Sequence, residues 1–88
     1  MPIDTRAEAE KEAKAEIRRA RRAKFFPTKA ADFRRDCARM VLKNARDWRD
    51  RGEMGKAVYV ARVARGHLII ARAWDREAAR LAAKNAVH

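Results

Sequence analysis

The residues with the clearest chemical potential are arginines that recur along the last third of the chain. At 3.6 residues per turn they fall on one side of a helix. The row consists of Arg62, Arg65, Arg72, Arg76 and Arg80. A guanidinium group can donate two parallel hydrogen bonds to phosphate oxygens, and successive helical turns rise about 5.4 Å. Such a row can follow a nucleic-acid backbone, so we predict nucleic-acid binding here, mostly through phosphate contacts.

Two further groups of basic residues extend this prediction. A secondary contact is expected at the end of the first predicted helix, at Arg18, Arg19, Arg21 and Arg22. The second predicted helix adds cations if it faces the same way, namely Arg35, Arg39, Lys43 and Arg46. The plain alternative is a solvated charged face that binds nothing.

The overall charge also favours an anionic partner. The chain has 88 residues and a formal net charge of +11, from 23 basic and 12 acidic side chains. The excess is spread over the whole length, and a charge this far from zero repels itself. The chain is rich in Ala and Arg and lacks Ser and Gln. A GC-rich genome would favour the same residues, so codon bias is a second explanation for part of the excess.

Catalysis and metal binding have little support in the sequence. There is no serine, and Cys37 and His67 lack a third member of a catalytic group. The glycines do not form a phosphate-binding loop. A metal site needs three or four ligands, which the chain does not place together. We therefore predict no enzyme activity, no cofactor and no metal, with Cys37 buried as a small apolar residue and His67 buried and hydrogen-bonded.

The same composition bears on location. No apolar run is long enough to cross a bilayer, so we expect no membrane span. Cys37 is the single cysteine and cannot form an internal disulfide. The first residues alternate alanine with charge and do not form an apolar signal region. A cytoplasmic protein is the expectation.

These residues must be positioned by helices. The pattern predicts one all-α domain over residues 1–88, with helices at about 5–24, 29–50 and 54–85. Asp4 or Thr5 can cap the first helix, and Thr28 the second. Gly52 is suited to end the second helix. The connection that follows is short, so the second and third helices should form a long antiparallel hairpin.

The apolar residues define the expected packing. The side of the second helix predicted to be apolar comprises Phe33, Cys37, Met40, Val41, Asn44, Ala45 and Trp48. Phe25 and Phe26 should plug the end of the core, with stacking on bases as the alternative. The first helix has a thin apolar side and should pack weakly or project. Gly66, inside the third helix, marks either a kink or the close approach of another backbone.

A protein partner is the rival to nucleic acid. The chain could be an interaction module, an adaptor or inhibitor, that docks on an acidic protein or a nucleoprotein complex. Exposed Trp48, Phe25 or Phe26 would favour this function. A homodimer is also expected if the hairpin leaves Ile70, Trp74 and Leu81 open. Binding to an anionic membrane surface is a third and weaker alternative.

The turn at Gly52 has features of two helical motifs. The spacing of Gly52, Ala57 and Ala64 resembles one half of a tetratricopeptide repeat over about twenty residues. No second repeat follows, and hairpin packing alone requires small residues there. A helix-turn-helix would need a shorter first helix and an apolar residue at Arg51. Sequence-specific reading of the major groove is therefore not predicted.

Overall fold

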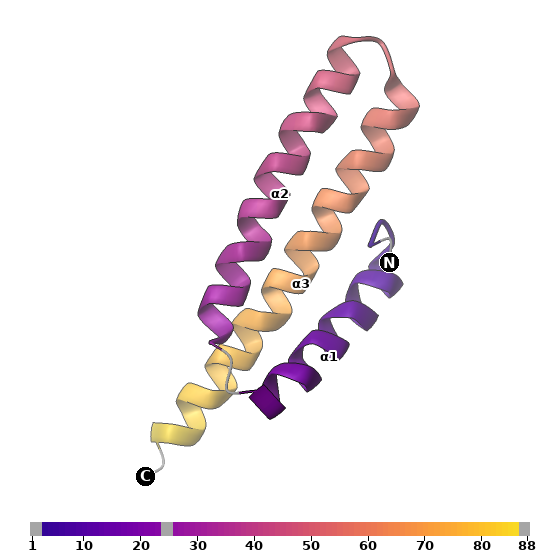
Figure 1. Cartoon of the computed structure of the whole chain (residues 1–88). Helices are drawn as coiled ribbons and strands as arrows, with labels where there is room; N and C mark the ends of the chain where they lie inside the picture. The colour runs from indigo at the N-terminus through magenta and orange to yellow at the C-terminus, as the bar shows by residue number, and fades with distance from the viewer. Residues whose placement is uncertain (1–2, 24–25, 87–88) are drawn as a thin grey trace.

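The computed structural model describes residues 3–23 and 26–86 and confirms the all-α hairpin (Figure 1). Its helices are α1 (Arg6–Ala23), α2 (Pro27–Asp50) and α3 (Met54–Ala86). α2 and α3 run antiparallel along the long axis of a molecule that measures 56 × 19 × 18 Å. α1 lies against α3 and leaves the end of the hairpin near the turn uncovered.

The starts of α1 and α2 agree with the backbone preferences of the residues there, but α2 begins earlier than we predicted. The Thr5 Oγ1 atom accepts a hydrogen bond of 3.2 Å from the backbone N–H of Glu8, which confirms Thr5 as a cap. α2 begins at Pro27 rather than 29, and its N-cap is Phe26, so Thr28 is not the cap. Proline is well suited to the first helical position because its φ is already helical and it has no N–H to leave unpaired.

The turn between α2 and α3 is built on Gly52, as predicted. Its φ is 81°, a left-handed conformation that favours glycine. The Gly52 N–H donates to the Arg49 carbonyl, and the Glu53 N–H donates to the Trp48 carbonyl, each at 2.9 Å. These two bonds form a Schellman motif, which satisfies the last carbonyls of α2 and reverses the chain.

The hairpin is held together by two alanine stripes with a seven-residue repeat. α2 contributes one stripe and α3 the other, and all six residues are at most 7% exposed: Ala31, Ala38 and Ala45, and Ala57, Ala64 and Ala71. Members of the two stripes lie at equal distances from the turn, so they oppose one another in the antiparallel pair. Side chains this small let two helix backbones approach closely along a shallow crossing.

The alanine stripes correct the predicted orientation of α2. The side that faces α3 is rotated from the one we predicted, so Phe33 and Met40 are 63% and 71% exposed. Cys37 is half-buried rather than buried. Phe26 is 65% exposed and does not plug the core, and Phe25 lies outside the described residues.

α1 packs more firmly than its thin apolar side predicted. Ala9 and Ala13 are buried against α3, and Ile17 and Ala20 pack beside them. The core cluster they join contains Ile3, Ala30, Ala31, Ile70, Ala73 and Trp74. Ile70 and Trp74 are thereby only 0% and 3% exposed, so the dimer surface predicted through them is closed by α1. Leu81, the third residue named for that surface, is half-buried.

Gly66 lies where the N-terminal segment crosses α3. A Cβ atom at Gly66 would lie 1.9 Å from the backbone oxygen of Ile3, closer than any real contact. This confirms the predicted close approach of another backbone. α3 continues without interruption through this position, so the kink that we gave as the alternative is not found.

Replacement of Gly66 by alanine should therefore lower stability. Gly→Ala inside a helix ordinarily stabilises by about 1 kcal/mol. Here the clash should displace Ile3, whose burial contributes about 1.5–3 kcal/mol. We expect a net loss of about 1 kcal/mol and a melting temperature lower by about 4–8 °C in thermal unfolding followed by circular dichroism. Gly55→Ala is the control, because that position is open and should be neutral or stabilising. A stabilised Gly66→Ala variant would contradict the close approach.

Candidate nucleic-acid interface

Four arginines of the predicted row are open on the surface of α3. They are exposed and form no ion pair or hydrogen bond with other described residues: Arg62, Arg65, Arg72 and Arg76. We call them the four open arginines. At 3.6 residues per turn they lie within a sector of about 80°, and Arg62 and Arg76 are about 21 Å apart along the axis. α3 therefore presents one narrow line of uncompensated positive charge.

Arg80, the fifth residue of the row, is engaged within the protein. Its guanidinium donates to both carboxylate oxygens of Glu77, at 2.7 and 3.1 Å. Arg21 of α1 donates to the same carboxylate at 2.9 and 3.0 Å. The prediction treated Arg80 as part of a row with few compensating acids, and in the folded chain Glu77 compensates it. The Arg21–Glu77 pair thus helps to hold α1 on α3, while Arg80 pairs with Glu77 within α3.

Glu77 is the acid at the centre of this group and its side chain is only 5% exposed. Hydrogen bonds from Arg21 and then from Arg80 lower the pKa of its carboxyl group to about 2, which outweighs the opposing effect of burial. Sequence reasoning placed Glu77 beside the arginine row and did not pair it, because Arg21 lies 56 residues away.

The remaining predicted contacts divide into paired and unpaired cations. Arg19 pairs with Glu12, and Arg39 pairs with Asp36. Arg35 bridges two acids, Asp32 on its own helix and Asp75 on α3. Among these predicted contacts, Arg18 and Arg22 on α1 and Lys43 and Arg46 on α2 are exposed and form no ion pair with a described residue. The fold does not gather all predicted site residues into one patch.

α1 adds basic residues beside the open arginines. A groove of about 340 Å³ runs along the seam between α1 and α3. Lys14 and Arg76 line it from opposite helices, and Ile17 and Ile69 contribute to its apolar lining. Lys14 is exposed and makes no ion pair with a described residue. The basic surface therefore extends from α3 onto this side of α1.

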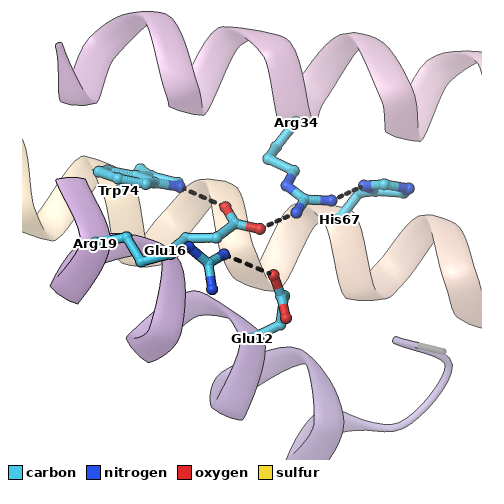
Figure 2. Close-up of polar contacts among 6 residues, drawn as sticks. All are labelled: Glu12, Glu16, Arg19, Arg34, His67 and Trp74. Carbon is cyan, nitrogen blue, oxygen red and sulfur yellow. Dashed lines mark hydrogen bonds and ion pairs between the residues drawn. The ribbon is translucent and has the colours of Figure 1, made fainter. Parts of the chain in front are cut away.

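A polar network joins all three helices on the other side of α1 (Figure 2). Within the described residues, no Cα atom of α1 lies within 8 Å of one in α2. The gap is bridged by Glu16 of α1, which pairs with Arg34 of α2 and accepts a hydrogen bond of 3.1 Å from Nε1 of Trp74. Arg34 also donates to Nδ1 of His67 at 2.9 Å. Sequence reasoning missed Glu16 and Arg34, since nothing local indicates this pairing.

His67 is hydrogen-bonded, as predicted, although it is half-buried rather than fully buried. A guanidinium can only donate, so Nδ1 is the acceptor and the neutral ring carries its proton on Nε2. Burial lowers the pKa of His67 and the Arg34 cation lowers it further, while Glu16 opposes the shift. The network thus favours the neutral imidazole.

An apolar groove lies between α1 and α2, above Trp74. Its volume is about 520 Å³, and Phe33 forms part of its wall. The other lining residues are Glu16, Arg19, Ala20, Ala23, Lys29, Ala30 and Arg34. The exposed Phe26 lies nearby in sequence, with the Lys29 ammonium 5.3 Å from its ring centroid. These apolar side chains are the kind of surface on which protein partners bind.

The described part of the chain contains neither a metal-binding group nor a membrane-spanning helix. Within residues 3–23 and 26–86 there is no group of three or more His, Cys, Asp or Glu side chains arranged to hold a metal ion. No helix of that part of the chain is long and apolar enough to cross a membrane. Comparison of the chain with models of protein families, with curated proteins and with solved structures found no match.

Replacement of Glu77 by glutamine should remove an acid-dependent part of the stability. A carboxyl group whose pKa is lower in the folded state stabilises the fold above its unfolded pKa, and this contribution is lost as the pH falls through its folded pKa. For Glu77 the window lies between about 4.5 and about 2. In urea unfolding, wild type should lose stability across this window more steeply than Glu77→Gln. At neutral pH the variant should be less stable by about 1–2 kcal/mol, a figure reduced because both arginines are half exposed to solvent. Parallel pH profiles would contradict the pairing.

His67 should produce a separate pH dependence at higher pH. Its pKa is lower in the folded protein than the ordinary 6.5, so the unfolded chain takes up the proton first. Stability should then fall as the pH drops below about 6.5, because the unfolded chain binds more protons than the folded protein in this range. His67→Gln keeps an acceptor for Arg34 and cannot titrate, so its stability should be flat in this range. The measurement is urea unfolding of both proteins at several pH values between about 7.5 and 5.

Proposed function

We propose that this protein binds nucleic acid through phosphate contacts made by the four open arginines of α3. The supporting observation is that these guanidinium groups are exposed, aligned and unpaired among the described residues. The other 19 Lys and Arg side chains of the chain could also attract a polyanion, but several of them are held by acids, as Arg35 and Arg80 are. The aligned and uncompensated charges are the part of the surface suited to contact a regular row of phosphates.

The geometry of α3 agrees with backbone rather than base recognition. Its line of open arginines is about 21 Å long, and duplex DNA carries one negative charge per about 1.7 Å of its axis. Every open arginine can therefore meet a phosphate. Exposed alanines lie next to the line at Ala61, Ala79 and Ala83, and they let that part of the helix approach the duplex closely. Phosphate contacts carry no sequence information directly, so binding should be non-specific or dependent on shape.

The α1 side provides the secondary contact. Lys14 lies across the seam from Arg76, and Arg18 is exposed one turn further along α1. A phosphate backbone that leaves the α3 line can reach these cations. The total charge of +11 adds a long-range attraction that raises the rate of association with any polyanion.

The salt dependence of binding tests this function. If the four open arginines neutralise four phosphates, the logarithm of the association constant should fall with the logarithm of salt concentration with a slope of about −3.6. Raising salt from about 50 to about 200 mM should then weaken binding about 150-fold. In the double variant Arg72→Ala/Arg76→Ala, the slope should be about −1.8 and the loss about 12-fold. The measurement is fluorescence anisotropy with labelled DNA and RNA duplexes of about 20 base pairs.

A control with the same change of charge separates position from net charge. Arg49→Ala/Arg51→Ala also removes two positive charges, but from the turn end of the hairpin. Its slope should stay near that of the wild type. If both double variants weaken binding equally, or if the wild-type response to salt is flat, the open arginines are not the binding surface.

A protein-interaction module is the second candidate. It is favoured by the exposure of large apolar side chains, with Phe26, Phe33 and Met40 each more than 60% exposed. Such a module would dock on an acidic protein or on a nucleoprotein complex. Capture of a partner that survives nuclease treatment, and is unchanged by Arg72→Ala/Arg76→Ala, would favour this function over nucleic-acid binding.

A further inference from the structure

The side of α3 that receives α1 continues beyond the end of α1. Three lines of residues with a seven-residue repeat run along this side: Tyr59–Gly66–Ala73, Lys56–Val63–Ile70 and Val60–His67–Trp74. Residues seven apart lie almost in line on a helix. α1 and the segment before it cover the second and third residues of each line. This cover ends near Gly66, where Ile3 lies against α3. The first position of each line lies nearer the turn, where α1 does not reach (Figure 1).

The uncovered part of the hairpin is apolar at its centre. Val41 and Trp48 of α2 continue the seven-residue line that starts at Arg34, and both are half-buried. On α3, Val60 is half-buried and Tyr59 is 49% exposed. We call the surface formed by Val41, Trp48, Lys56, Tyr59 and Val60 the distal face. On α3 it lies on the uncovered stretch from Met54 to Gly66, which is about 18 Å long.

Two cations converge on the one indole ring of the distal face. The Lys56 ammonium lies 4.5 Å from the centroid of Trp48, and the Arg51 guanidinium carbon lies 5.3 Å from it. Neither cation forms an ion pair with a described residue, although Glu53 is close in sequence. Two like charges held at one ring repel each other, and a carboxylate placed between them would relieve that repulsion.

α1 shows how a helix can occupy such a surface on this hairpin. Its small residues Ala9 and Ala13 lie against α3, while the carboxylate of Glu16 meets a cation and an indole, Arg34 and Trp74. The distal face offers a similar combination of apolar side chains, an indole and basic side chains. The distal face has no counterpart of Glu16 among the described residues, and a helix of another molecule could supply that acid.

We propose that the distal face binds an acidic amphipathic helix of a partner protein, about twelve residues long. Its apolar stripe packs on Val41, Tyr59 and Val60, and its carboxylates meet Lys56 and Arg51. A second copy of this chain fits less well, because two chains of +11 would be brought together and the acid-bearing helix α1 is already packed. This inference rests on the second candidate function and is independent of the four open arginines.

The test uses the full chain and a designed helical peptide as the probe. The labelled peptide has about 15 residues, with Leu at i, i+4, i+7 and i+11, Glu on both flanks and Ala elsewhere. A scrambled peptide of the same composition is the control for charge alone. Lys56→Glu and Tyr59→Arg change exposed positions and should preserve the fold. Each should weaken binding of the designed peptide at least tenfold in fluorescence anisotropy, and the scrambled peptide should bind at least tenfold more weakly to wild type.

Two matched variants locate the binding. Phe33→Ala removes an aromatic from the groove between α1 and α2, and Arg72→Ala/Arg76→Ala removes two open arginines. Neither should change peptide affinity more than twofold. If Phe33→Ala abolishes peptide binding and Tyr59→Arg does not, the distal face is not the binding site. The second candidate function, protein interaction, would still stand.

The other outcomes also decide the proposal. Equal binding of the designed and scrambled peptides, or no binding of either, would overturn it. If sedimentation analysis shows a concentration-dependent dimer and Tyr59→Arg abolishes it, the distal face binds a second copy of this chain instead of a partner helix. Nucleic-acid binding that Lys56→Glu weakens and Tyr59→Arg does not, with no effect of Arg72→Ala/Arg76→Ala, would assign the distal face to nucleic acid and overturn both proposals.

Discussion

The close approach of α2 and α3 through their alanine stripes is the constraint from which the rest of the structure follows. Alanine favours helix and brings the two backbones together, but it buries little apolar surface. The interface has no room for larger side chains, so Phe33 and Met40 lie outside it. The hairpin is therefore long, narrow and thin in its core, and several of its large apolar residues are exposed, Phe33 and Met40 among them.

Charged groups supply part of the cohesion that the apolar core lacks. Glu16 of α1 pairs with Arg34 of α2, and Arg21 of α1 pairs with Glu77 of α3, which Arg80 also contacts. Charges placed at the seam between helices lose solvation, so they are stable only when each has a partner. The packing of α1 therefore depends on the ionisation of groups such as Glu77. It is also specific in register, because these pairs can form only when α1 lies at one position along α3.

The same pairing determines which charge is left for function. Glu16, Asp75 and Glu77 pair with arginines of a neighbouring helix. The α3 line from Arg62 to Arg76 faces away from these pairs and forms no ion pair with a described residue. A second uncompensated pair, Lys56 and Arg51, lies near the turn on a different side of the hairpin. The two surfaces differ in chemistry: the first is charge beside small residues, and the second is charge around aromatic and aliphatic side chains.

The sequence by itself determined the features that depend on neighbouring residues. The three helices, the cap at Thr5, the turn at Gly52 and the alignment of the α3 arginines follow from backbone preferences and helical periodicity, which act within a few residues. At Gly66 the sequence left two alternatives, a kink or the close approach of another backbone, and the tertiary structure decided for the second. Only the tertiary structure decided that α1 covers Ile70 and Trp74, that Phe33 faces solvent and that Glu77 neutralises Arg80. These outcomes depend on which of several similar helix faces pack together. They also depend on ion pairs between residues as much as 56 positions apart. The spacing of neighbouring residues contains no information on either.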